Sequence, residues 1–138
     1  MSRRATSAIC AALALAGCGS SSSDEAVRTT FARGVGQIRA SHNSTALSGQ
    51  LRQTISRLRG EGVSSKTTRR GRRLAIAGFE QTLRSVEARI DFTENDSGNI
   101  EAATRDARRA NRYGERGAKL LRRAGRALDV TVGRLHGY

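Results

Sequence analysis

The chain has 138 residues and a formal net charge of +13, with 25 basic and 12 acidic side chains. It contains no proline or tryptophan, and its aromatic residues are three Phe and two Tyr. This length allows one modest domain and excludes a two-lobed architecture. So few aromatic side chains make nucleic acid an unfavourable partner, because proteins hold single-stranded bases largely by stacking.

The N-terminal residues have the pattern of an export signal. Arg3 and Arg4 supply a positive start, and residues 5–16 carry no charge, with a short apolar core at 9–16. This core is far shorter than the ~20 apolar residues of a membrane-spanning helix, so it predicts a cleaved signal. The arginine pair also resembles a twin-arginine signal. Thr6 stands where that signal has an apolar residue, so the export route stays open.

The tetrapeptide Leu15-Ala16-Gly17-Cys18 ends the apolar core and resembles the lipobox of bacterial lipoproteins. The small side chains of Ala16 and Gly17 leave room for a protease, and the Cys18 thiol is a nucleophile that can take a lipid. The resemblance implies that residues 1–17 are cleaved and that Cys18 becomes a lipidated first residue. The protein would then sit at the cell membrane, on its extracytoplasmic side. The alternative is an ordinary secretory signal that ends at a cysteine by chance.

The mature part divides into a tether and a domain. Residues 18–23 are expected to be the lipidated cysteine and a flexible spacer, because Gly19–Ser23 is a Gly-Ser run. Residues 24–138 are expected to form the folded domain. Cys10 would leave with the signal, so no disulfide can form and the fold depends on burial. Removal of the signal takes away two arginines and would leave a net charge of +11.

After the tether, apolar residues recur at spacings of three and four, which predicts an all-α domain. The first segment begins at the acidic residue Asp24, which suits a helix N-terminus, and ends at Gly60, which is typical of a helix end. Its apolar positions are Val27, Phe31, Val35, Ile38, Leu47, Leu51, Ile55 and Leu58. The pattern is interrupted around Asn43, where Asn43 and Ser44 could cap a new helix. The segment is therefore either one helix or two.

The second segment starts at Ser64 or Ser65, either of which is a suitable N-cap, and ends at a turn predicted for residues 95–99. Its apolar positions are Ile76, Phe79, Leu83, Val86 and Ile90. The third segment has a seam of small and apolar residues at Ile100, Ala103, Ala107, Ala110, Gly114, Gly117, Leu121, Ala124, Leu128 and Leu135. Such a seam lets neighbouring helices approach closely, although each glycine costs about 1 kcal/mol of helix stability.

Because the segments have similar lengths if the first is continuous, we expect an antiparallel three-helix bundle with coiled-coil-like packing. The alternative is a bundle of four helices, in which the first segment breaks near Asn43.

Basic residues form two groups. The first is a stripe on the third segment, formed by Arg105, Arg109, Arg112, Arg116, Lys119, Arg123 and Arg126. Each member follows a seam position by two residues, about 200° around the helix, which predicts an outer face about 30 Å long. The second group opens the middle segment and comprises Lys66, Arg69, Arg70, Arg72 and Arg73. Positive charge at a helix N-terminus opposes the macrodipole, so this cluster suggests a role other than helix stability.

These groups predict adhesion to an anionic partner. In a three-helix bundle the cluster from Arg57 to Arg73 and the C-terminal arginines lie at the end far from the membrane. There they would meet an anionic wall polymer or an acidic protein. In a four-helix bundle the loop at 60–65 returns to the membrane side, where its arginines would contact anionic lipid headgroups. The remaining alternative is a solvated face that keeps a lipid-anchored protein soluble.

No group of residues at catalytic or metal-ligating spacing accompanies these basic clusters. His42 and His136 have no carboxylate or cysteine at ligand spacing, and a solvated helix face explains Glu80 and Glu87. We therefore expect a structural or interaction protein that is not an enzyme and uses no cofactor or metal. The alternative is a small enzyme or ligand-binding bundle whose pocket is not visible in residue spacing.

Overall fold

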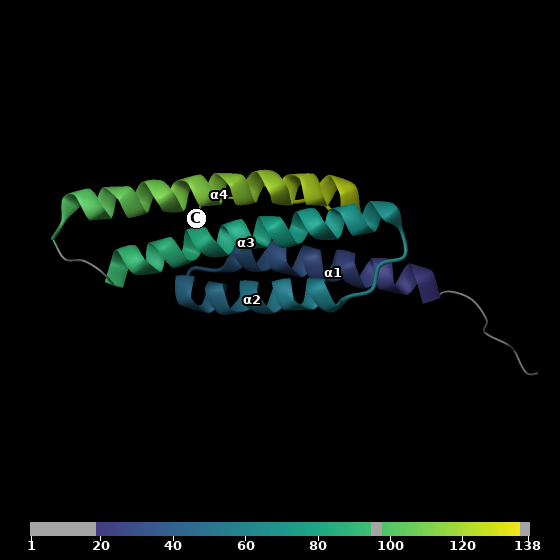
Figure 1. The fold of residues 1–138 in the computed structure, drawn as a ribbon. Helices are drawn as coiled ribbons and strands as arrows, with labels where there is room; N and C mark the ends of the chain where they lie inside the picture. The colour runs from purple at the N-terminus through teal and green to yellow at the C-terminus, as the bar shows by residue number, and fades with distance from the viewer. Residues whose placement is uncertain (1–18, 95–97, 136–138) are drawn as a thin grey trace, which may run out of the picture.

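The computed structural model describes residues 19–94 and 98–135, and these residues form four α-helices and no strand. The helices are α1 (Gly19–Ala40), α2 (Ser44–Gly60), α3 (Lys66–Glu94) and α4 (Ile100–Leu128), as Figure 1 shows. The all-α prediction is confirmed, whereas the three-helix bundle is wrong. The export signal and the tetrapeptide at 15–18 lie outside the described residues. α1 already begins at Gly19, so the Gly-Ser run expected to be a flexible spacer is helical.

The first segment divides because Asn43 starts a new helix. Asn43 has an extended backbone, with φ −120° and ψ 113°, and its side chain accepts a hydrogen bond from the Ala46 N–H at 2.9 Å. The reversal lets α2 return alongside α1, so that Leu47 and Leu58 join Phe31 in one core. A continuous helix would carry the α2 residues away from α1. The burial of α2 side chains against α1 therefore favours a break between the two helices. The Asn43 cap is enough to start the second helix, and no glycine or proline is needed at the break.

α3 and α4 form a long antiparallel hairpin joined by close packing. At Gly117 of α4, a Cβ atom would lie 2.6 Å from the Thr82 hydroxyl and 3.0 Å from the Thr82 backbone nitrogen on α3. The hydroxyl of Ser85 donates across the same interface to the Ala110 carbonyl at 2.7 Å. The predicted small-residue seam is therefore a site of close approach between helices.

The seam does not extend to the start of α4. Ile100 is 80% exposed and Ala107 is also exposed, because α1 and α2 stop short of this end of the hairpin (Figure 1). We call described residues 89–94 and 98–109 the hairpin tip. None of them is buried, so the tip consists of two helices without a core of their own.

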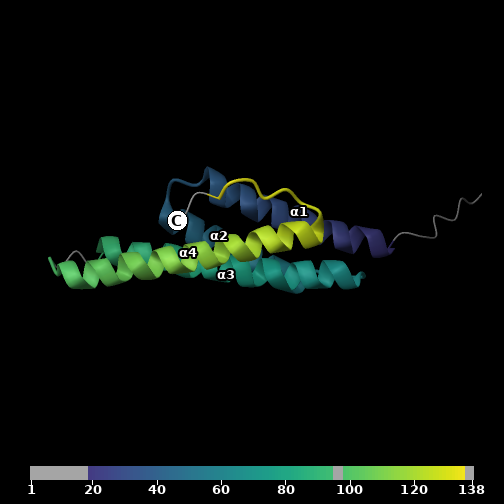
Figure 2. The ribbon, with the colours of Figure 1, turned by 90° about the horizontal axis from the view of Figure 1, so that it is seen from above.

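α4 ends at Leu128 and not, as the seam predicted, near Leu135. Asp129 takes a left-handed conformation with φ 56°, and the Val130 N–H donates to the Gly125 carbonyl at 2.9 Å. The chain then turns back along α1 (Figure 2), and Val132 is buried against the core. This reversal lets residues 130–135 cover apolar surface that a longer helix would leave exposed.

Candidate functional site

Four chain segments meet at one end of the bundle. They are the start of α1, the loop at 61–65, the first turns of α3 and the last turns of α4 (Figure 1). The hydroxyl oxygens of Ser23 and Ser64 lie 3.3 Å apart, which joins the start of α1 to the loop. This arrangement follows from the even number of helices, since α2 carries the chain back to the end where α1 began.

Asp24 links α1 to the loop at 61–65 and to the start of α3. Its side chain is buried, and its carboxylate accepts hydrogen bonds from the Ser64 N–H at 2.8 Å and from the Thr68 hydroxyl at 3.0 Å. The backbone N–H of Ser64 is the main cause that lowers the pKa of Asp24 well below its ordinary value, against burial, which raises it. Hydrogen bonds from Ser65 and Thr68 lower the pKa of Asp24 further. The carboxylate therefore stays ionised and ties α1 to the start of α3.

Ser65 caps α3, as one of the two sequence alternatives predicted. Its hydroxyl oxygen accepts from the Thr68 N–H at 3.0 Å, and its carbonyl oxygen accepts from the Arg69 N–H at 3.0 Å. With the Asp24 charge beside this cap, the N-terminus of α3 has the anion that its dipole favours. This anion offsets part of the repulsion between the dipole and the basic residues that follow.

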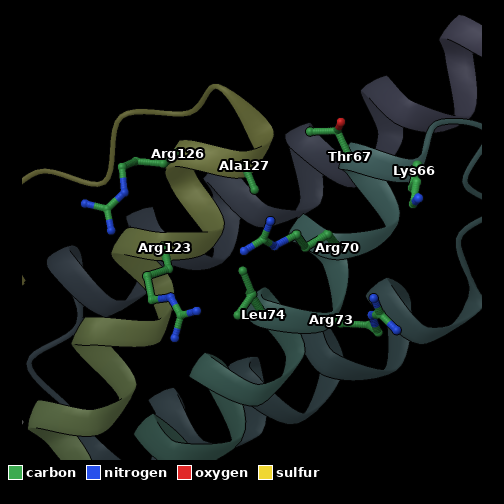
Figure 3. Close-up of a pocket in the computed structure, with 8 residues that line it drawn as sticks. All are labelled: Lys66, Thr67, Arg70, Arg73, Leu74, Arg123, Arg126 and Ala127. Atoms are coloured by element: carbon green, nitrogen blue, oxygen red, sulfur yellow. The ribbon is translucent and has the colours of Figure 1, made fainter.

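A groove opens between the first turns of α3 and the last turns of α4. It has a volume of about 540 Å³, and we call it the basic groove. Its walls are formed by Lys66, Thr67, Arg70, Arg73, Leu74, Arg123, Arg126 and Ala127 (Figure 3). The basic groove joins two predicted groups, since three of its cations come from the 66–73 cluster and two from the stripe on α4.

Helical spacing explains why these cations share a groove. Lys66, Arg70 and Arg73 are separated by four and three residues, so they lie on one face of α3. Arg123 and Arg126 are three residues apart on α4, and both are exposed and line the groove. In Figure 3 the guanidinium groups of Arg70 and Arg123 both reach into the space between the helices. The spacing of Lys66, Arg70 and Arg73 was visible in the sequence, and the three-helix prediction already placed the C-terminal arginines at the same end. The groove between them was not predicted.

Five basic residues line the basic groove, and no carboxylate of a described residue lines it. In Figure 3 the guanidinium groups of Arg73 and Arg126 point away from the space between the helices, so these two charges stand at its rim. None of the five cations takes part in a hydrogen bond or an ion pair within the described part of the chain. The C-terminus of α4 favours Arg123 and Arg126, whereas the N-terminus of α3 disfavours Lys66 and Arg70. The geometry thus concentrates unpaired positive charge, which a bound anion would neutralise.

The other predicted basic residues lie elsewhere. Arg69 is exposed but does not line the groove. Arg72 is half-buried and donates to the backbone carbonyl of Glu61, so it braces the loop at 61–65. The rest of the stripe is exposed along the outer face of α4, as predicted, at Arg105, Arg109, Arg112, Arg116 and Lys119.

Glu80 and Glu87 form ion pairs between α2 and α3. Arg59 pairs with Glu80 at 2.6 Å and Arg52 pairs with Glu87 at 2.7 Å. All four side chains are substantially exposed, so each pair contributes at most about 1 kcal/mol. These carboxylates hold arginines on the α2 face, away from the basic groove.

The described residues include no group of His, Cys, Asp and Glu that could hold a metal ion, and no helix among them is long and apolar enough to cross a membrane. His42 is exposed, and His136 lies outside the described residues. Comparison of the chain with family models, with curated proteins and with solved structures finds no match.

Proposed function

We propose that the protein is a non-enzymatic lipoprotein, held at the extracytoplasmic face of the cell membrane by a lipid on Cys18, whose basic groove contacts anionic lipid headgroups. The observation that carries the proposal is that the basic groove lies at the same end of the bundle as Gly19, the first residue of α1. Contact with a distant wall polymer assumed three helices, and that assumption no longer holds.

The distances involved support contact with headgroups. Because α1 is helical from Gly19, the path from Gly19 to Asp24 rises only about 8 Å along the helix axis. The Asp24 carboxylate accepts a hydrogen bond from the Ser64 N–H, and Lys66 lies two residues after Ser64. Electrostatic attraction is screened over about 8 Å at physiological ionic strength. A lipid on the residue before Gly19 would therefore place Lys66, at the near edge of the basic groove, about one screening length from anionic headgroups.

The free energies involved suggest that the groove orients the bundle on the membrane. Two or three acyl chains would already anchor the protein stably, at about 0.8 kcal/mol per buried methylene. Each basic residue near an anionic surface adds about 1 kcal/mol, so the five groove cations add enough to favour one orientation. The groove end would face the bilayer, and the hairpin tip would point away from it.

The test has two arms. The Cys18→Ser variant of the full chain should lose the acyl mass and leave the membrane fraction, and identical fractionation of both forms would refute the anchor. In the second arm, the chain from Gly19 onward is sedimented with phosphatidylcholine vesicles, with and without phosphatidylglycerol, and with purified cell wall. We expect salt-sensitive binding to phosphatidylglycerol vesicles that weakens at least tenfold when Arg70→Gln and Arg73→Gln are combined.

The matched control combines Arg105→Gln with Arg109→Gln, which removes the same charge from the hairpin tip. It should weaken binding far less, because these side chains would face away from the bilayer. Equal losses in the two variants would show that the bundle lies flat on the membrane. Binding to cell wall but not to vesicles would favour the wall polymer as partner.

A further inference from the structure

We infer that the basic groove is a binding site for a phosphate-bearing group with at least two negative charges, either a phosphomonoester or two adjacent phosphates. This inference rests on the proposed function for the surface that meets the headgroups. It goes further, because it assigns to the groove a preference for phosphate over other anions of equal charge.

The side chains that line the groove suit phosphate. Four of the five cations are arginines, and a guanidinium can donate two parallel hydrogen bonds to one phosphate. Arg70 and Arg123 reach into the groove from opposite helices (Figure 3), so one ligand could contact both. Thr67 also lines the groove and carries a hydroxyl group that can donate a hydrogen bond. A carboxylate offers fewer oxygens and could engage fewer of these donors.

The charge of the groove suits a polyanion. With five cations and no lining carboxylate among the described residues, a monoanion would leave most of the repulsion in place. Elsewhere on the described surface, Arg28, Arg52 and Arg59 each pair with a glutamate, whereas no glutamate or aspartate lines the groove. A dianion or trianion would neutralise more of the groove charge and gain correspondingly more Coulomb energy.

The groove also has the size and walls of a small-molecule site. Its volume of about 540 Å³ falls within the range of roughly 300–1,000 Å³ that is usual for ligand pockets. Leu74 and Ala127 contribute apolar walls. These walls offer a ligand apolar contact that a flat basic surface would not provide.

The helices that form the groove are held rigidly. A Cβ atom on Gly71 would lie 2.5 Å from the Leu128 side chain and 3.4 Å from Ala127, so α3 and α4 are in close contact at the groove. Asp24 fixes the start of α3 to α1 on the other side. A site whose cations stand on fixed helices loses little conformational freedom on binding, and this favours selective recognition.

The test uses the full-length protein in non-ionic detergent and isothermal titration calorimetry with inorganic pyrophosphate. Citrate, a tricarboxylate, serves as the comparison anion. We expect pyrophosphate to bind at least tenfold more tightly than citrate. The Arg70→Gln, Arg123→Gln double variant should weaken pyrophosphate binding at least tenfold. The matched control, Arg69→Gln with Arg122→Gln, removes the same charge from the same helices outside the groove and should weaken it less than threefold.

Equal affinity for pyrophosphate and citrate, equal effects of the two double variants, or no pyrophosphate binding would each overturn the inference. Circular dichroism checks that both double variants fold, which is expected because all four side chains are exposed. If vesicles bind but pyrophosphate is not preferred, the inference fails and the proposed function stands. If pyrophosphate binds selectively but no anionic vesicle does, the proposed function fails.

Two vesicle compositions identify the source of the phosphate. Phosphatidic acid presents a phosphomonoester, whereas phosphatidylglycerol presents a phosphodiester. Preference for phosphatidic acid at matched surface charge, with competition by pyrophosphate, assigns the groove to a lipid headgroup. Selective pyrophosphate binding without this preference assigns it to a soluble phosphate compound.

Discussion

At the groove end of the α3–α4 hairpin, α1, the loop at 61–65 and the returning C-terminal segment all pack against the two helices. At the hairpin tip, no described residue is buried, and Phe92 and Ile100 are exposed. The same helix pair is thus supported at one end and unsupported at the other. Regions with few buried apolar contacts open most easily, so we expect the tip to be the less stable end. The basic groove lies at the end where more segments pack against the two helices.

The largest effect is expected for a substitution in the hydrophobic core, which supports the groove end of the hairpin but not the tip. Phe79 is fully buried, and its ring packs against Phe31 with centroids 5.8 Å apart. Phe79→Ala should lower the free energy of unfolding by about 3–5 kcal/mol, measured by urea denaturation. Phe92→Ala, at the tip, should change it by less than about 0.5 kcal/mol. Similar losses would mean that the tip is as well packed as the core.

A smaller effect is expected for a substitution at the close contact between α3 and α4. Gly117→Ala gains about 1 kcal/mol of helix propensity, but the added Cβ would lie 3.0 Å from the Thr82 backbone nitrogen. Overpacking of this kind costs about 1–3 kcal/mol, so we expect net destabilisation by roughly 1 kcal/mol.

The control is Gly49→Ala on α2, where no atom lies within 4 Å of the added Cβ. This exposed position should gain roughly 0.5–1 kcal/mol in the free energy of unfolding. Gains of equal size at both positions would show that α3 and α4 are not in close contact at Gly117.

The effect expected at Asp24 has a distinct pH dependence. Because its pKa is lowered on folding, its ionised form stabilises the folded state fully above the unfolded pKa of about 3.8. This contribution decreases as the pH falls below that value, because the unfolded chain then binds a proton that the folded chain does not. It is lost fully only when the folded carboxylate is protonated as well.

Asp24→Asn should therefore be less stable than the unmodified chain at pH 7, and the difference should shrink as the pH is lowered below 4. Thermal unfolding at several pH values measures this. Glu25→Gln, which removes only an exposed ion pair with Arg28, should show little change at any pH. A constant difference between Asp24→Asn and the unmodified chain at all pH values would contradict the assigned charge interaction.

Much of the fold followed from local patterns in the sequence. The spacing of apolar residues predicted helices, and Ser65 is the cap of α3, as the preference of serine for this position suggested. The glycine seam of α4 predicted close helix packing, and the basic stripe lies on the outer face, because both depend only on the helical repeat. The lipidation of Cys18 stays a prediction.

The number of helices and the basic groove were decided by tertiary structure. At Asn43 the local signals for a cap and for a continuous helix were nearly balanced, and the burial of Leu47 and Leu58 against α1 favours the break. The same reversal brings Asp24 to the start of α3, which no sequence spacing indicated. Arg70 and Arg123 are far apart in the chain and share a groove only because the fourth helix returns to the end where the third began. Local chemistry determined which faces are apolar or charged, whereas the burial of long-range contacts determined which charged faces meet.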